Sequence, residues 1–228
     1  DPNGSRLWLE RVEEPFEIVR LTSNAIYSLR LSHPLDRERR DRYKLRLRAW
    51  DGQRKSARSV HHVDWVVCVK VLDMNDNVPV FSRSVYEFDL PENSGPNAVV
   101  GHLAISDADE GINGHVSVRL LNLTSMFAIR GTTLYALKSF DREINGEYLL
   151  DVESRDHGSP IELSSRALIR VNIVDVNDNA PQLNESDYVI AVEENNLYGG
   201  RPIRIFESRD ADAYPFNQVE YFAQSRDR

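Results

Sequence analysis

A single cysteine, Cys68, occurs among the 228 residues of the chain. One thiol cannot form an internal disulfide bond, so a small fold stapled by disulfides is excluded. Cysteine-based zinc sites are excluded for the same reason, and the adjacent His61 and His62 are interpreted as a solvated strand edge rather than as metal ligands. If the chain works outside the cell, something other than disulfide bonds must stiffen it.

Long apolar runs are also missing. No stretch of about 18 apolar residues occurs, so no membrane-spanning helix is predicted. No basic segment followed by an apolar one opens the chain at Asp1, so a secretion signal is expected to be missing or already removed. We therefore expect the chain to be a piece of a longer protein.

Basic residues are fewer than acidic ones, with 28 Lys and Arg against 36 Asp and Glu and a net charge of −8. This balance disfavours a nucleic-acid partner. Residues 1–72 nevertheless carry 15 basic and 10 acidic residues, so the acidic excess lies in residues 73–228. Such polarity would favour antiparallel overlap of two copies, whereas the alternative is that Lys44, Arg46 and Arg48 form a solvated strand face.

What the chain does contain is an internal repeat. The sequence Asp-Met-Asn-Asp-Asn at 73–77 returns as Asp-Val-Asn-Asp-Asn at 175–179, an offset of 102 residues. Four further elements recur in the same order at offsets of 102 to 105 residues. Leu-Pro-Glu-Asn at 90–93 returns as Val-Glu-Glu-Asn at 192–195, Asp-Ala-Asp at 107–109 returns at 210–212, Asp-Arg-Glu at 36–38 returns at 141–143, and a lone aspartate occurs at Asp51 and again at Asp156. The order and spacing identify tandem copies of one structural unit.

The segments between these motifs alternate apolar and polar residues. Residues 43–50, 148–152 and 167–174 follow this pattern, which is typical of half-buried strands, and no long amphipathic helical pattern appears. A unit of about 102 residues has the size of a seven-stranded Greek-key β-sandwich. The predicted fold is all-β, with a unit at 1–77 that lacks its first strands, a complete unit at 78–179 and a partial unit at 180–228.

The Asp/Asn motifs are predicted to be extended linkers that bind calcium. Each is followed by a proline two positions on, which disfavours helix and biases the preceding residue to extended backbone. Carboxylate, amide and carbonyl oxygens suit Ca²⁺, which takes six to eight such ligands. An EF-hand is excluded, because Val78 and Ala180 stand where its glycine belongs, and Ser84 and Ser186 where its glutamate belongs.

With these motifs together, the whole chain resembles cadherin ectodomain repeats. The turn at 107–115 is more similar to protocadherins and to the Fat/Dachsous-like members of that family. The resemblance implies up to three Ca²⁺ ions at each complete junction between repeats. It also implies an extracellular position on the plasma membrane, with any transmembrane segment lying outside this chain.

The resemblance also implies which residues bind the ions. At the first junction these are Asp36, Glu38, Asp73, the Met74 carbonyl, Asn75, Asp76, Asn77, Asp107, Asp109, the Asn113 carbonyl and Asp156. At the second junction they are Glu92, Asp141, Glu143, Asp175, the Val176 carbonyl, Asn177, Asp178, Asn179, Asp210, Asp212 and the Asn217 carbonyl. The sequence departs from the family pattern at 213–216, where Ala-Tyr-Pro-Phe replaces a glycine-containing turn.

The function implied is calcium-dependent cell adhesion, with another cadherin ectodomain, from the same or a different protein, as partner. The alternative is an extracellular spacer or receptor-ligand segment that bears tension without adhesive contact. No enzymatic activity is expected, because the recurring carboxylates are all assigned to metal and no nucleophile–histidine pair stands out. Glycosylation sequons occur at Asn3, Asn122 and Asn184, and Cys68 is expected on the outward side of its strand.

Overall fold

The computed structural model describes residues 6–9, 15–22, 26–51, 61–122, 124–194, 199–200 and 202–224. The chain divides into two compact units. Unit 1 comprises Asp1–Val78, Asp107–His115 and Asp156–Leu163, and unit 2 comprises Pro79–Ser106, Val116–Arg155 and Ser164–Arg228. The described residues form strands, turns and extended segments and contain no helix. They therefore include no helix that could span a membrane.

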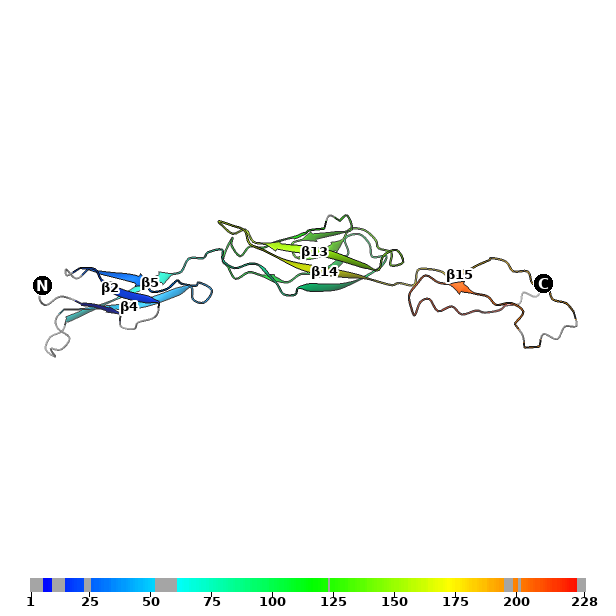
Figure 1. Cartoon of the computed structure of the whole chain (residues 1–228), viewed down its shortest axis with the longest axis horizontal. Coiled ribbons are helices and arrows are strands. Elements are labelled where there is room, and N and C mark those ends of the chain that lie inside the picture. Colours follow the sequence, from blue (N-terminus) through cyan, green and yellow to red (C-terminus); the bar gives the residue numbers. More distant parts are fainter. Residues whose placement is uncertain are drawn as a thin grey trace. The chain divides into compact units, whose positions relative to one another are not determined.

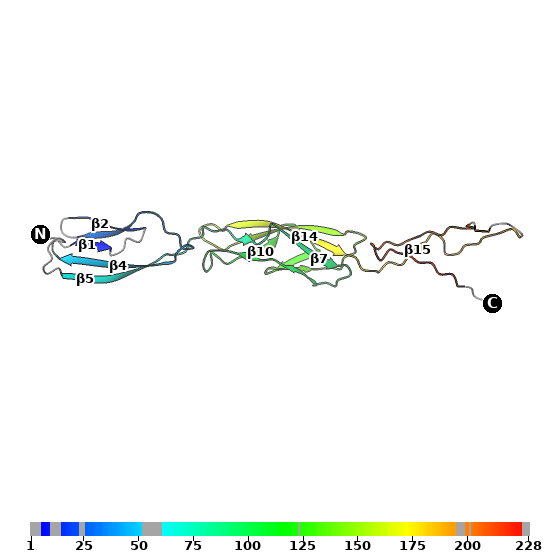
Figure 2. The ribbon, with the colours of Figure 1, turned by 90° about the horizontal axis from the view of Figure 1, so that it is seen from below.

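Unit 1 is built from a three-stranded sheet and a hairpin. The sheet has the order β1 (Arg6–Leu9), β4 (Arg42–Asp51), β5 (His61–Lys70), and the hairpin pairs β2 (Phe16–Arg20) with β3 (Tyr27–Leu31). All of these pairings are antiparallel, and Figure 2 shows β1, β4 and β5 side by side.

The alternating pattern in β4 decides which of its faces is buried. Tyr43, Leu45 and Leu47 point into the core of unit 1, where they pack with Phe16, while Lys44 stays exposed between them. This confirms the predicted strand and the exposure of Lys44. Arg48 departs from the predicted solvated face, because it is partly buried and donates two hydrogen bonds, of 2.5 and 2.6 Å, to Asp64 on the neighbouring strand. Cys68 is exposed, as predicted from its outward position in the neighbouring strand.

Unit 2 contains a β-sandwich of seven main strands. The first sheet has the order β10 (Ser117–Leu120), β13 (Glu147–Arg155), β14 (Ser164–Val174), β7 (Val85–Pro91), and the second has the order β11 (Phe127–Arg130), β12 (Thr133–Ala136), β8 (Val99–His102). Two short strands, β6 (Val80–Phe81) and β9 (Ile105–Ser106), pair beside them. The predicted all-β sandwich class is confirmed (Figure 1).

The core of the sandwich follows from the same two-residue period. Val152 from β13 and Ile169 and Val171 from β14 are completely buried, and so is Leu134 from the facing sheet. A cluster of aromatic rings at 127, 140 and 148 closes the core, with centroids 4.9 to 5.4 Å apart. Strand β7 joins β14 in parallel, so the first and last main strands of the sandwich are neighbours.

The rest of unit 2 has little regular structure. Residues 180–224 contain only the short pair β15 (Gln182–Leu183) and β16 (Ser208–Arg209) among their described residues. Val189 is 98% exposed and Phe222 88% exposed, although both are large and apolar. The described residues of this segment therefore enclose no core comparable to that of the sandwich.

The buried carboxylate of Glu153, on the outer face of the first sheet, is surrounded by three arginine side chains. Glu153 is 2% exposed and contacts Arg119 at 2.6 Å, Arg166 at 3.3 Å and Arg155 at 3.4 Å. The hydrogen bond from Arg119, with the positive charges around it, lowers the pKa of Glu153. A carboxyl group whose pKa is lower in the folded state than in the unfolded state stabilises the fold at pH values above its unfolded-state pKa. This stabilisation is lost as the pH falls through the folded-state pKa.

We therefore expect Glu153→Gln to remove part of the acid sensitivity of unit 2. The free energy of unfolding should differ less between neutral pH and pH values below the usual glutamate pKa of about 4.3 than it does in the wild type. Urea titrations at the two pH values measure this difference. Glu87→Gln is the matched control, because Glu87 is exposed and lies 3.6 Å from Arg170 on the same sheet. Equal acid sensitivity in the wild type and the Glu153 variant would contradict the prediction.

Candidate metal centres

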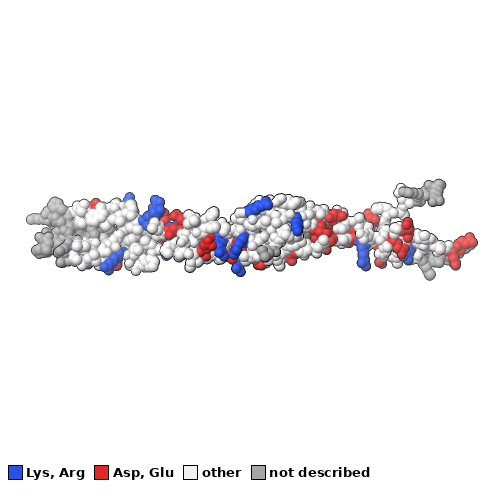
Figure 3. All heavy atoms as spheres, turned by 90° about the horizontal axis from the view of Figure 1, so that it is seen from above, with Lys and Arg blue, Asp and Glu red and all other residues white. Residues whose placement is uncertain are grey.

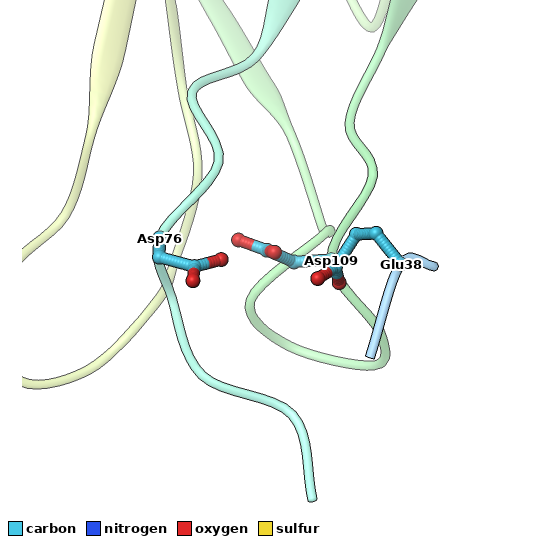
Figure 4. Close-up of side chains that lie close together, drawn as sticks. All are labelled: Glu38, Asp76 and Asp109. Carbon is cyan, nitrogen blue, oxygen red and sulfur yellow. The ribbon is translucent and has the colours of Figure 1, made fainter. Parts of the chain in front are cut away.

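The first acidic cluster lies within unit 1. It brings together the turn at 36–38, the extended linker at 73–77, the loop at 107–115 and the residues that follow β13. Carboxylate oxygens of Glu38, Asp76 and Asp109 all lie within 4.8 Å of one another. Figure 4 shows these three side chains pointing toward a common point. Three carboxylates held this close favour a bound cation.

Local hydrogen bonds hold the carboxylates of this cluster in place. Asp109 is buried and accepts hydrogen bonds from the backbone N–H of Asn77 at 3.2 Å and from its Nδ2 at 2.7 Å. Asp107 Oδ1 accepts from the backbone N–H of Asp109 at 3.0 Å, which folds the Asp-x-Asp turn back on itself. The linker and this turn are thereby attached to each other at the predicted ligands.

Asp156 is completely buried at the edge of the same cluster. Its Oδ1 accepts from the N–H groups of Gly158 and Leu163, each at 3.0 Å, and its Oδ2 accepts from Asn75 Nδ2 at 3.2 Å. The absence of a side chain on Gly158 makes room for Asn75, because a Cβ there would lie 2.0 Å from Asn75 Cγ. The lone aspartate of the motif set is thus joined directly to the linker.

Two oxygens in the first cluster have no hydrogen-bond partner. Among the described residues, Asn75 Oδ1 and Asp107 Oδ2 are the buried side-chain oxygens without one. Burial, together with the charges of Asp109 and Asp156, raises the pKa of Asp107. An unpartnered buried oxygen carries a desolvation penalty, and a hard cation would relieve it at both atoms. The donor set therefore fits Ca²⁺.

The second acidic cluster lies within unit 2 and is built in the same way. Glu92, Asp141 and Glu143 have carboxylate oxygens within 4.8 Å of one another, and so do Glu143, Asp175 and Asp212. Glu92 is 3% exposed and accepts from the N–H groups of Val176 at 2.7 Å and Arg142 at 2.9 Å. Burial, followed by neighbouring negative charges, raises the pKa of Glu143.

The contacts at the two Asp-x-Asp turns repeat from one cluster to the other. Asp212 accepts from Asn179 Nδ2 at 2.7 Å, as Asp109 does from Asn77, and Asp210 Oδ1 accepts from the Asp212 N–H at 3.0 Å. On the face drawn in Figure 3, acidic side chains gather in groups rather than spreading evenly. One local arrangement therefore occurs twice in the chain.

Several predicted ligands also make hydrogen bonds within their own turns or linkers. Asp36 and Asp141 use an oxygen to accept an N–H within their own turns, from Arg39 at 2.9 Å and Ile144 at 3.1 Å. The Met74 carbonyl accepts from the Asp76 N–H at 3.0 Å. The Asn217 N–H donates to the Ala213 carbonyl at 3.3 Å, so the altered turn still closes. Asp178 accepts from Asn179 Nδ2 at 2.8 Å, and Asn177 lies in the same linker.

Sequence reasoning missed three residues in these clusters. Arg37 and Arg142, between the two acids of each Asp-Arg-Glu motif, form ion pairs with Asp73 and Asp175. Asn93 donates from Nδ2 to Asp178 and has a positive φ of 58°. The sequence signal for the two arginines is that both Asp-Arg-Glu motifs carry an arginine at the same position. Reasoning from oxygen ligands alone does not consider it, because arginine does not bind Ca²⁺.

The asparagines of two of the three glycosylation sequons lie in the part of the chain that the structure describes. Asn122 is exposed, and its Oδ1 accepts a hydrogen bond from the backbone N–H of Asp151 in β13. Asn184 is exposed as well, and Asn3 lies outside the described residues.

The sequence profile of the cadherin domain matches residues 86–174. Protein dachsous of Drosophila melanogaster is 39% identical over 178 residues, which cover 77% of this chain and 5% of that protein. Human Protocadherin Fat 4 is 34% identical over 218 residues, 91% of this chain and 4% of that protein. The chain therefore spans about one twentieth of the length of these relatives.

Solved structures show the same architecture. The extracellular domain of Protocadherin GammaB4 superimposes with a TM-score of 0.80 at 29% sequence identity, covering 92% of this chain and 34% of that one. Human CDH23 EC21-23 gives a TM-score of 0.72 at 26% identity, covering 95% of this chain and 72% of that one.

Proposed function

Because the chain belongs to the cadherin superfamily, we propose that it is an ectodomain segment whose bound Ca²⁺ stiffens the linkers at 73–77 and 175–179 for adhesive binding to another cadherin ectodomain. Cadherin ectodomains are adhesion modules and not enzymes, so the chain is not an enzyme. The observation that supports calcium binding is the repeated carboxylate cluster, with unpartnered buried oxygens on Asn75 and Asp107.

The proposal assigns the two clusters as the metal sites, with up to three ions at each complete junction. The ligands of the first are the predicted residues at 36, 38, 73–77, 107, 109, 113 and 156. Those of the second are the predicted residues at 92, 141, 143, 175–179, 210, 212 and 217. It further divides the chain into repeats at 1–77, 78–179 and 180–228 and places them on the extracellular side of a plasma membrane, with glycans at the sequons.

Charge neutralisation is the contribution that Ca²⁺ makes when bound. Two carboxylates about 5 Å apart repel each other by roughly 3 kcal/mol at an effective dielectric constant of about 20. At a calcium concentration ten times the dissociation constant, one site stabilises its bound state by about 1.4 kcal/mol. Several sites in series would therefore convert a loose linker into a stiff one over a narrow range of calcium concentration.

The removal of one linker carboxylate tests the calcium proposal. We expect Asp178→Ala to lower the heat of calcium binding at the second cluster while both units stay folded. Titration calorimetry at millimolar calcium measures this, and circular dichroism checks the fold. Asp89→Ala is the matched control, because Asp89 is exposed and accepts a hydrogen bond from Asn172 outside the cluster. No calcium uptake by the wild-type chain would contradict the proposal.

Adhesion is separated from a spacer role by bead aggregation. Beads coated with the chain should clump in calcium and disperse in chelator if the segment carries an adhesive surface. Beads that bind calcium but never clump would favour the tension-bearing spacer.

A further inference from the structure

We infer that Arg37 and Arg142 are braces that hold the first aspartate of each linker against the Asp-x-Asp turn without the help of a metal ion. Each brace joins three segments of the chain: the Asp-Arg-Glu turn, the linker and the Asp-x-Asp turn. The inference stands independently of the proposed calcium binding, because every contact in it is between protein atoms.

The second cluster shows the brace in its simpler form. Arg142 Nε donates to Asp175 Oδ1, and Arg142 Nη2 contacts Glu143. The same Nη2 donates to the carbonyl oxygen of Ala211 at 3.2 Å. The remaining oxygen of Asp175, Oδ2, accepts from the N–H of Ala213 at 3.0 Å. A single arginine and a single aspartate thereby tie the linker to both sides of Asp212.

The first cluster has the same four contacts at equivalent positions. Arg37 pairs through Nε with Asp73 and through Nη2 with Glu38, and the same Nη2 donates to the Ala108 carbonyl at 2.6 Å. Asp73 Oδ2 accepts from the N–H of Glu110 at 3.0 Å. The recurrence of all four contacts in two segments about 103 residues apart indicates a built feature rather than a chance surface ion pair.

The first brace has two additional contacts. Asn113 Nδ2 donates to Asp73 Oδ2 at 2.8 Å, and Arg37 Nη1 lies 3.5 Å from the Glu110 carboxylate. The second turn offers neither, because Ala213 stands in place of Glu110 and Asn217 makes only a backbone bond within its turn. We therefore expect the second brace to be the weaker one.

Burial separates the braces from ordinary surface ion pairs, which contribute little because water screens them. The side chains of Arg37 and Asp73 are 11% and 13% exposed, and those of Arg142 and Asp175 are 24% and 11% exposed. Charge-assisted hydrogen bonds in such shielded places are stronger than exposed ones. Both oxygens of Asp73 and of Asp175 accept protein donors, so these aspartates act as bridges between segments. A carboxylate oxygen has two lone pairs, so this bridging is compatible with the ligand role proposed for them above.

The test is amide hydrogen exchange at Ala213, measured by NMR on the whole chain in chelator. Arg142→Gln should speed exchange at Ala213 about ten-fold, because Asp175 loses the cation that holds it in place. Arg142→Lys keeps the charge but not the forked geometry and should give an intermediate rate. Arg166→Gln is the matched control on β14, where the arginine contacts Glu153 at 3.3 Å instead.

The amide protection of Ile169 and Val171 in the sandwich core reports whether each variant is folded. Should the Arg142 variant fail to fold, Arg37→Gln with exchange at Glu110 provides the same test in unit 1. Unchanged exchange at Ala213 and at Glu110 in folded variants would overturn the brace. Calcium uptake is measured separately, so a chain that takes up no calcium would refute the proposed function and leave the brace standing.

Discussion

Replacement of Asp156 by alanine is expected to lower the free energy of unfolding by about 2–4 kcal/mol and to abolish calcium binding at the first cluster. The side chain is 0% exposed and accepts three hydrogen bonds, two of them from backbone N–H groups of its own loop. Alanine leaves these donors without a partner in a site that excludes water, and that loss is the physical reason for the size of the effect.

Asp156→Asn separates the two consequences. The amide keeps one acceptor oxygen for the loop, so most of the stability should remain, whereas the lost charge should still weaken calcium binding. Urea titration followed by circular dichroism measures stability, and calorimetry measures calcium uptake. An Asp156→Asn variant that binds calcium like the wild type would show that this residue acts only through the loop.

Replacement of Ile169 by alanine is expected to destabilise unit 2 by about 3 kcal/mol. Ile169 is 0% exposed in the middle of β14, and its loss leaves a cavity between the two sheets. The midpoint of urea unfolding followed by circular dichroism should fall with little change in slope. Leu149→Ala on β13 is the matched control, because Leu149 is 52% exposed and its truncation opens no cavity.

The tryptophans allow the two units to be followed separately in this experiment. All three occur in the first 65 residues of the chain, at positions 8, 50 and 65, and unit 2 has none. Tryptophan fluorescence should therefore report unit 1 and remain unchanged in Ile169→Ala. An equal shift of both signals would show that the units unfold together.

The strands could be predicted from the sequence because their pattern is local. The alternation at 43–47 places Tyr43, Leu45 and Leu47 inside, and the same rule buries Ile169 and Val171 in β14. The parallel pairing of β7 with β14 could not be predicted in this way, since it joins residues about 80 positions apart and depends on the packing of the whole sandwich.

The candidate site was predictable in residue type but not in its detailed roles. The motifs predicted which residues supply oxygen ligands, and in the structure carboxylate oxygens of Glu38, Asp76 and Asp109 lie within 4.8 Å of one another. The spacing alone could not show that Asp73 and Asp175 already accept protein donors. An arginine in an acidic motif has the same spacing whether it faces solvent or turns inward, so its position depends on the tertiary fold.

The parallel contact between β7 and β14 has a mechanical consequence. The chain enters the sandwich through β7 and leaves it through β14, and seven residue pairs from Val85 to Pro91 join the two strands. A pull on the chain from its two ends draws these strands in opposite directions along their length. The hydrogen bonds that connect the two strands are then loaded together in shear instead of being opened one after another. The sandwich is therefore expected to resist a force best when that force is applied through the two ends of its own chain.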